Sequence, residues 1–106
     1  MELDALVKQA QAAPPMKRID WRDPIAAHGT RAIAAVQPWL TDPALAAFAV
    51  RVIERVGADD HATEAVQVLR GARSNVPPFV RTDVDWALRH LRVEPAGANA
   101  RTPRQP

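Results

Sequence analysis

One segment constrains the fold more than any other: residues 38–57, with the sequence PWLTDPALAAFAVRVIERVG. Its apolar residues recur every three or four positions, which predicts an α-helix with one broad apolar face. The residues of this face are Leu45, Phe48, Ala49, Val52, Ile53 and Val56, with Ala46 and Val50 at its side. Because so wide a face needs two neighbours, we expect the helix to lie between others, with Phe48 and Ile53 near the centre of the fold. Gly57 should end it as a left-handed cap.

The N-terminal residues predict a short helix followed by a linker. Residues 2–13 form an amphipathic pattern that ends at Pro14-Pro15, which cannot continue a helix. The apolar face of this helix carries Leu3, Leu6, Val7 and Ala10. Residues 14–22 should form the linker, and we expect Trp21 to pin it to the body because a Trp side chain is costly to leave in water.

A repeated dipeptide marks the start of two helices. Asp23-Pro24 and Asp42-Pro43 each place an Asp that can accept a first-turn amide before a Pro whose missing donor does no harm there. The first of these helices should run toward Leu40, with a break at Gly29 and a kink at Pro38. Its core face carries Ile33, Val36 and Leu40.

Two more helices are expected in the C-terminal half. Asp59-Asp60 should open a helix that runs to about Ala72. The last helix should start at Pro78, or at Thr82 where Thr82-x-x-Asp85 fits a capping box, and should run to about Val93. The expected inward residues are Ala62, Ala65, Val66 and Leu69 on the first, and Val80, Val84, Ala87, Leu88 and Leu91 on the second.

The chain contains no alternating run of β-branched residues between hairpin turns, so no strand is expected. The sequence therefore predicts an all-α fold, a compact bundle of four to five helices, and 106 residues suffice for one small domain. Its expected parts are the N-terminal helix and linker, residues 1–23, the helical domain, residues 24–93, and a disordered tail, residues 94–106.

Composition excludes several classes of function. The chain has no Cys, which excludes disulfides, thiolate zinc sites and a cysteine nucleophile. No apolar run approaches the roughly 20 residues that span a bilayer, so we expect a cytoplasmic protein without a membrane partner. The formal net charge is only +2, which predicts weak attraction to nucleic acid. The many Arg, Ala and Pro residues are typical of a high-GC bacterial or phage genome.

Residues suited to catalysis or metal binding are present but are not spaced for either. Asp59-Asp60-His61, His28 and His90 could be metal ligands, yet no two of these histidines lie within one helical turn of each other. Ser74 lacks the glycine-flanked turn that exposes a nucleophilic hydroxyl. No glycine-rich phosphate loop is present either. We therefore expect neither a cofactor nor a metal, and we expect no enzyme activity.

Residues 29–57 resemble a helical repeat of the HEAT (armadillo-like) type. The likeness rests on GTRAIAAVQPWL with its kinking Pro, on the Asp-Pro turn, and on the Ala-rich second helix that Gly57 closes. Repeats of that family usually carry a Val-Arg pair shortly after the turn Asp, and this chain has Leu45 and Ala46 in those places. The resemblance implies a HEAT-like central hairpin and a surface for holding partners, sometimes nucleic acid.

The last helix predicts a second apolar stripe opposite its core face. This stripe carries Phe79, Trp86, His90 and Val93. If the N-terminal helix folds back over Trp86, the stripe is ordinary core. If it does not, an exposed aromatic patch beside arginines has the composition of a protein-interaction hot spot. The sequence leaves both alternatives open.

Arginines of the C-terminal half offer an alternative function. A basic strip of Arg70, Arg73, Arg81, Arg89 and Arg92 could contact phosphate, although Asp83 and Asp85 interleave it. We expect at most weak, sequence-independent binding. The preferred hypothesis is a non-catalytic module that binds another protein, or a second copy of itself, through the aromatic stripe of the last helix.

Overall fold

The computed structural model describes residues 2–91, and every regular element within them is helical. In chain order the elements are α1 (Leu3–Ala12), α2 (Pro15–Arg18), η1 (Ile19–Trp21), α3 (Arg22–Ala26), α4 (Thr30–Val36), η2 (Gln37–Thr41), α5 (Ala46–Val56), η3 (Gly57–His61), α6 (Ala62–Ala72), η4 (Pro78–Val80) and α7 (Arg81–Leu91). The prediction of an all-α bundle is confirmed. The predicted disordered tail, residues 94–106, lies outside the described residues.

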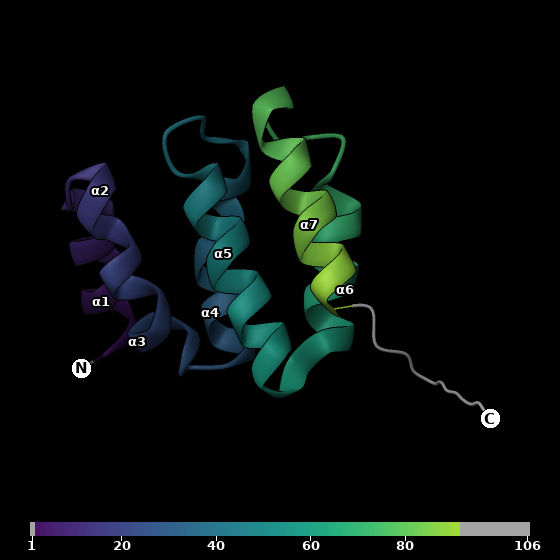
Figure 1. Ribbon diagram of the computed structural model, residues 1–106. Coiled ribbons are helices and arrows are strands. Elements are labelled where there is room, and N and C mark those ends of the chain that lie inside the picture. Colours follow the sequence, from purple (N-terminus) through teal and green to yellow (C-terminus); the bar gives the residue numbers. More distant parts are fainter. Residues whose placement is uncertain (1, 92–106) are drawn as a thin grey trace.

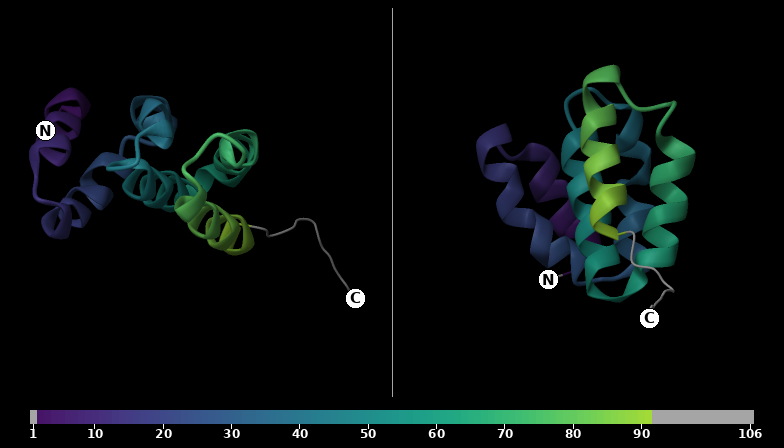
Figure 2. Two further views of the ribbon diagram at one scale, coloured as in Figure 1. Left: turned by 90° about the horizontal axis from the view of Figure 1, so that it is seen from above. Right: turned by 45° about the vertical axis from the view of Figure 1, so that its right-hand side comes forward.

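The helices form three antiparallel pairs that stand in a row (Figure 1). The first pair is α1 with the α2–α3 segment, the second is α4 with α5, and the third is α6 with α7. Seen from above, the helices lie in two layers: α1, α4 and α6 on one side, and α2–α3, α5 and α7 on the other (Figure 2). Helix α5 contacts α3, α4, α6 and α7, so it holds the three pairs together.

Helix α5 is the most buried element, as its wide apolar face predicts. Val52, Ile53 and Val56 are completely buried, and Phe48 retains only 8% of its exposure. Ala46 and Val50, at the side of the predicted face, are buried as well. Because α5 is flanked by helices in its own layer and backed by α4, most of its circumference is covered.

A buried arginine joins the N-terminal pair to the rest of the fold. Leu3, Leu6 and Ala10 of α1 are buried as predicted, but the predicted linker contains two helical elements, α2 and η1. Within it, the Arg18 guanidinium is almost fully buried and donates to the carbonyls of Ala10 and Ala13, both at 2.8 Å. It thereby adds donors to carbonyls at the end of α1, of which the Ala10 carbonyl also accepts the Ala13 amide at 3.3 Å. A longer bond of 3.4 Å reaches the Ala44 carbonyl just before α5.

The expected break and kink of the second predicted helix are both present. Gly29 has a φ of 68°, in the left-handed region that favours glycine, and it separates α3 from α4. Pro38 lies in η2, where the α-helix tightens into a 3₁₀ turn because Pro removes one backbone hydrogen bond. The Asp42 carboxylate accepts a hydrogen bond from the Ala44 amide at 2.8 Å, but α5 begins later than the start signal predicts, at Ala46, and without a side-chain cap.

Two other predicted caps, at Asp23 and at Asp59-Asp60, are wrong because these residues lie inside helical segments and not before a helix start. Asp23 accepts a hydrogen bond from Arg22 Nε at 2.9 Å and lies 3.7 Å from Arg55 Nη1. Asp59 pairs with the same Arg55, at 3.3 Å from its Nε. Neither α3 nor α6 has a side-chain cap at its first residue. Asp23 is the second residue of α3 and Asp59 lies within η3, so neither stands before the free amides of a helix start, and each pairs with an arginine instead.

The predicted left-handed cap at Gly57 is also wrong. Gly57 has right-handed helical angles, φ −63° and ψ −40°, and the chain continues from it through the π-helical turn η3 into α6. Glycine is needed here for space. A Cβ atom at this position would lie 2.8 Å from the Ala65 Cβ and 2.8 Å from Leu91 Cδ2. Gly57 therefore lets α6 and α7 approach the end of α5 closely.

The last two helices follow the sequence closely. Helix α6 ends at Ala72 as predicted, with Ala65 and Leu69 fully buried. The last helical segment begins at Pro78, the first of its two predicted starts, with one 3₁₀ turn before α7. The residues of α7 that face the core are Val84, Ala87 and Leu91, with Val80 buried just before them.

Candidate functional site

The outer face of α7 carries the predicted second stripe. Phe79 is 65% exposed and Trp86 is 54% exposed, and His90 lies exposed one helical turn after Trp86. These side chains point away from the buried face of the same helix, because residues at spacings of three and four share one side. Val93, the fourth residue of the predicted stripe, lies outside the described residues.

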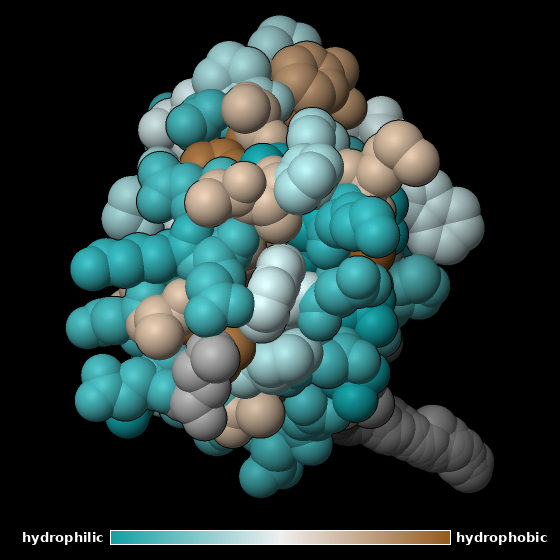
Figure 3. Space-filling view, turned by 90° about the vertical axis from the view of Figure 1, so that its left-hand side faces the viewer, coloured by the Kyte–Doolittle hydropathy of each residue, from teal (hydrophilic) through white to brown (hydrophobic). Residues whose placement is uncertain are grey.

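The N-terminal helix does not cover this stripe. Helix α1 packs on η1, α3 and α4, at the end of the row opposite α7 (Figure 1). The surface at that opposite end is mainly hydrophilic, with its hydrophobic residues in small separate groups (Figure 3). Of the two alternatives that the sequence leaves open for Trp86, the buried one is therefore wrong: within residues 2–91, Trp86 is a surface residue.

Two neighbours on α7 hold the Trp86 ring. The His90 imidazole lies with its centroid 5.4 Å from that of the indole, at an interplanar angle of 49°. The Arg89 guanidinium carbon lies 5.9 Å from the indole centroid, within the range of a cation–π contact. An aromatic ring supported on two sides has fewer rotamers to lose when a partner binds. This arrangement is suited to recognition.

A hollow lies between α5 and α7 beside Trp86. Its lining residues are Val50, Arg51, Glu54, Asp83, Trp86 and His90. His90 Nδ1 donates to Glu54 Oε2 at 2.5 Å, which ties the two helices together across the hollow. Among residues 2–91, Arg51 and Asp83 make no ion pair. The hollow therefore presents a free cation on α5 and a free anion on α7.

Sequence reasoning missed the part of this surface that α5 contributes. Arg51 and Glu54 fall outside the predicted apolar face of α5, and the sequence assigns them no role. The two helices are separated by the 24 residues 57–80, and no local pattern indicates that α7 packs beside α5. Only the positions of Arg51 and Glu54 on the polar side of a well-defined helix could have suggested them.

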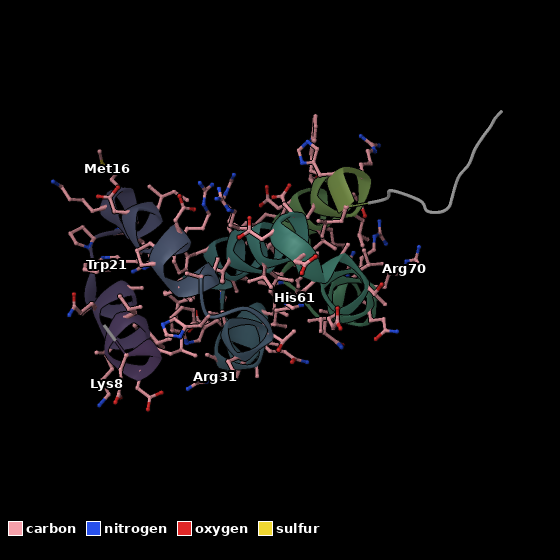
Figure 4. The ribbon with its side chains drawn as sticks, turned by 90° about the horizontal axis from the view of Figure 1, so that it is seen from below. Lys8, Met16, Trp21, Arg31, His61 and Arg70 are labelled. Carbon is pink, nitrogen blue, oxygen red and sulfur yellow. The ribbon has the colours of Figure 1, made fainter. Side chains whose placement is uncertain are left out.

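The arginine strip is only partly available for phosphate. Arg73 donates two hydrogen bonds to the Asp85 carboxylate, from Nε at 2.6 Å and from Nη2 at 3.0 Å. The hydrogen bond from Arg73, with a further contribution from Arg89, lowers the pKa of the Asp85 carboxyl, and the same pair raises the pKa of Arg73. Arg70 projects from α6 at the surface (Figure 4). The nucleic-acid function stays a prediction.

The other members of the strip differ in their surroundings. Arg81 is exposed, Arg89 lies over the Trp86 ring, and Arg92 lies outside the described residues. The cations of this strip thus do not form one uniform positive surface within residues 2–91, since one is neutralised by a carboxylate and another contacts an aromatic ring.

The candidate metal ligands named from the sequence do not come together in the structure. Within residues 2–91, no three His, Asp or Glu side chains are grouped to bind a metal. His61 Nε2 would lie 3.3 Å from a Cβ atom at Gly29, so the imidazole packs over the turn between α3 and α4. Asp59 is engaged by Arg55. His90, on α7, is bound to Glu54 of α5.

Comparison with protein-family models, with curated proteins and with solved structures found no match for this chain. The HEAT-type resemblance of residues 29–57, which correspond to α4, η2 and α5 with the residues next to them, therefore stays a prediction. None of the helices in the described part of the chain is long and apolar enough to cross a membrane.

Proposed function

We propose that this protein is a non-catalytic, cytoplasmic interaction module that binds a protein partner through the outer face of α7. The residues of this binding face are Phe79, Trp86, Arg89 and His90 on the last helical segment, with Arg51 and Asp83 lining the adjoining hollow. The observation that carries the proposal is the 54% exposure of Trp86 in a chain that has only three Trp residues.

The energetic argument rests on what an exposed Trp can contribute in a complex. A Trp side chain buries 150–250 Å² when it is fully covered. At about 25 cal/mol per Å² of apolar area, covering the exposed half of Trp86 is worth roughly 2 kcal/mol. Tryptophan and arginine are also the residue types that dominate measured binding hot spots. A face that combines Trp86, Phe79 and Arg89 is therefore suited to bind protein.

The arrangement of the helices supports the same function. Helices α2–α3, α5 and α7 lie side by side in one layer, so their outer faces form a continuous surface (Figure 2). Two further exposed apolar residues, Met16 and Ile19, lie on the α2 and η1 end of this layer. These two residues lie apart from the α7 face, and the HEAT-like hairpin that we expect at residues 29–57 would provide the rigid support for a partner seated on Trp86.

The test separates binding from stability in one substitution. We expect Trp86→Ala to leave thermal stability within about 0.5 kcal/mol of the wild type, because the side chain is a surface residue. The same change should abolish self-association and capture of a partner from the native host. Met16→Ala, which removes an exposed apolar side chain at the other end of the layer, is the matched control and should leave binding unchanged.

Two outcomes would contradict the proposal. A Trp86→Ala protein that captures the same partners and has the same oligomeric state as the wild type would exclude the α7 face as the binding surface. A loss of 3 kcal/mol or more of stability, about that of a buried Trp truncation, would show instead that Trp86 is needed for folding.

A further inference from the structure

We propose that the chain has a second binding site, a hollow between the α2–η1 segment and α5, which binds the carboxylate of an acidic peptide segment of a partner protein. Arg18 and Ile19 line this hollow from the α2–η1 segment, and Ala44, Phe48 and Arg51 line it from α5 and the turn before it. The site goes beyond the proposed function, because neither Trp86 nor any other residue of α7 lines it.

Arg18 brings to this hollow a buried positive charge that no carboxylate of residues 2–91 neutralises. The residue is only 9% exposed, and it forms no ion pair within the described chain. Its partners are backbone carbonyls, which accept hydrogen bonds but carry no net charge. An arginine stays charged in a protein, and the carboxyl end of a helix such as α1 supplies only about half a negative charge. Because a buried charge without an opposite charge is costly, an anion beside Arg18 would be stabilised.

One edge of the Arg18 guanidinium is available to such an anion. Nε and Nη2 make the two short hydrogen bonds, to the Ala10 and Ala13 carbonyls at 2.8 Å each. Nη1 carries two N–H groups, and within the described chain it has only one long bond, of 3.4 Å, to the Ala44 carbonyl. Ala44 itself lines the hollow, so a carboxylate oxygen placed there would accept the N–H that Ala44 leaves unused.

Arg51 adds a second cation, from the α5 side of the hollow. It stands one helical turn after Phe48, so the two residues share one side of α5. Arg51 is exposed and has no ion pair within residues 2–91. None of the described residues that line the hollow is an Asp or a Glu. Two cations without an anion give the hollow a charge that is complementary to a carboxylate.

The apolar part of the lining favours a peptide over other anions. Ile19 is 41% exposed, and Phe48 keeps a small exposed part next to Arg51. Inorganic phosphate would contact the two arginines and leave these apolar side chains uncovered. A nucleic acid would present its phosphates on a hydrophilic backbone. A peptide in which a Glu stands beside Leu residues places a carboxylate against the arginines and covers apolar surface at the same time.

The experiment titrates the full chain with two acetylated and amidated peptides, Leu-Glu-Leu-Leu and Leu-Gln-Leu-Leu, and follows the backbone amide resonances of the protein. The Glu peptide should shift the resonances of Ile19, Ala44 and Arg51. It should bind at least about tenfold more tightly than the Gln peptide, because only the Glu peptide has a carboxylate. Arg51→Gln should remove most of this preference. Arg70→Gln, which loses the same charge on α6, is the matched control and should keep it.

A second pair of variants tests the Arg18 edge without removing Arg18. Ala44→Glu supplies a carboxylate from the chain itself beside Nη1 of Arg18, and Ala44→Gln has the same shape without the charge. Ala44→Glu should have a higher melting temperature than Ala44→Gln, because its carboxylate lies beside a buried cation. It should also bind the Glu peptide at least about tenfold more weakly than Ala44→Gln does, because the site already holds an anion.

Contrary outcomes are separate for this site and for the proposed function. Equal affinities for the two peptides, or a preference that persists in Arg51→Gln, would overturn the carboxylate site. Inorganic phosphate is the third probe, and equal shifts at equal concentration would show a general anion site and overturn the peptide as its occupant. Peptide shifts centred on the Trp86 indole would also overturn this site, while they would support the α7 face as a binding surface.

Discussion

The first and the last helical pairs use the same residue types in opposite ways. In the first pair, Trp21 packs partly against the core and the Arg18 guanidinium is buried against backbone carbonyls. In the last pair, Trp86 is a surface residue and Arg89 lies on its ring. Both pairs end a row of helices, so position at the end of the fold does not explain the difference.

The contrast shows that the first pair depends on its own aromatic and arginine side chains for stability, and the last pair does not. Helix α1 is only Leu3–Ala12, and its buried residues are few, so Trp21 and Arg18 make up for a small contact area. The last pair is closed by the aliphatic contacts of α6 and α7 with each other and with α5. Its Trp and Arg are consequently free for another role. Four sets of substitutions test this difference, from the largest expected effect to the smallest.

Ile53→Ala should have the largest effect, because α5 supports both end pairs and Ile53 is completely buried. Truncation of a buried Ile costs about 2–5 kcal/mol through lost transfer energy and the cavity that remains. The midpoint of urea unfolding should fall in a single transition. An unchanged midpoint would mean that α5 does not hold the two end pairs together.

Trp21→Ala and Trp86→Ala compare the two pairs directly. We expect Trp21→Ala to lower the free energy of unfolding by about 2–3 kcal/mol, somewhat less than for a fully buried Trp because part of its ring remains exposed. Trp86→Ala should change it by less than about 0.5 kcal/mol. Thermal unfolding of both variants at a concentration where the chain is monomeric gives the two values. Equal losses of unfolding free energy in the two variants would show that the first and last pairs do not differ in their use of Trp.

Arg18→Ala should lower stability by about 2 kcal/mol, since it removes the two short hydrogen bonds from the guanidinium to the carbonyls of Ala10 and Ala13. Arg18→Lys keeps the charge but has a single ammonium group that cannot bind both carbonyls in the same geometry. The stability of Arg18→Lys should lie between that of the wild type and that of Arg18→Ala. Amide hydrogen exchange should increase first in α1, and equal exchange in α1 and α6 would argue against a local role for Arg18.

The Asp85–Arg73 pair predicts a small dependence of stability on acid. Because the bond from Arg73 lowers the pKa of Asp85 in the folded chain, its contribution is present above the unfolded value of about 3.9 and is lost as the pH falls through the folded pKa. Asp85→Asn should flatten the decline of melting temperature below about pH 4. Asp83→Asn serves as the control, because Asp83 has no ion pair within residues 2–91.

The buried faces of the helices could be predicted because apolar spacing is a local property of the sequence. The pattern around Phe48 and Ile53 fixed which side of α5 is buried, and the pattern around Val84 and Leu91 did so for α7. Gly29 and Pro38 also act locally, through one backbone angle and one missing hydrogen bond. None of these features requires knowledge of which helices become neighbours.

The remaining features depend on which residues become neighbours. Asp23 lies 3.7 Å from Arg55, more than 30 residues away, and Arg18 would be a surface residue if α1 did not end beside it. The candidate site shows the same limit. Its aromatic stripe was visible in the spacing of Phe79, Trp86 and His90, whereas the exposure of that stripe follows from where α1 packs.

The close packing around Gly57 links this position to the orientation of the α7 face, which Gly57 does not contact. A single methyl group there would overlap Ala65 and Leu91, so α6 or α7 would have to shift by a fraction of an ångström to make room. Leu91 is on the same helix as Trp86, and a shift of one end of a rigid helix changes the orientation of everything along it. A substitution at residue 57 would therefore alter the angle at which α7 holds Trp86, while every residue around Trp86 stays the same.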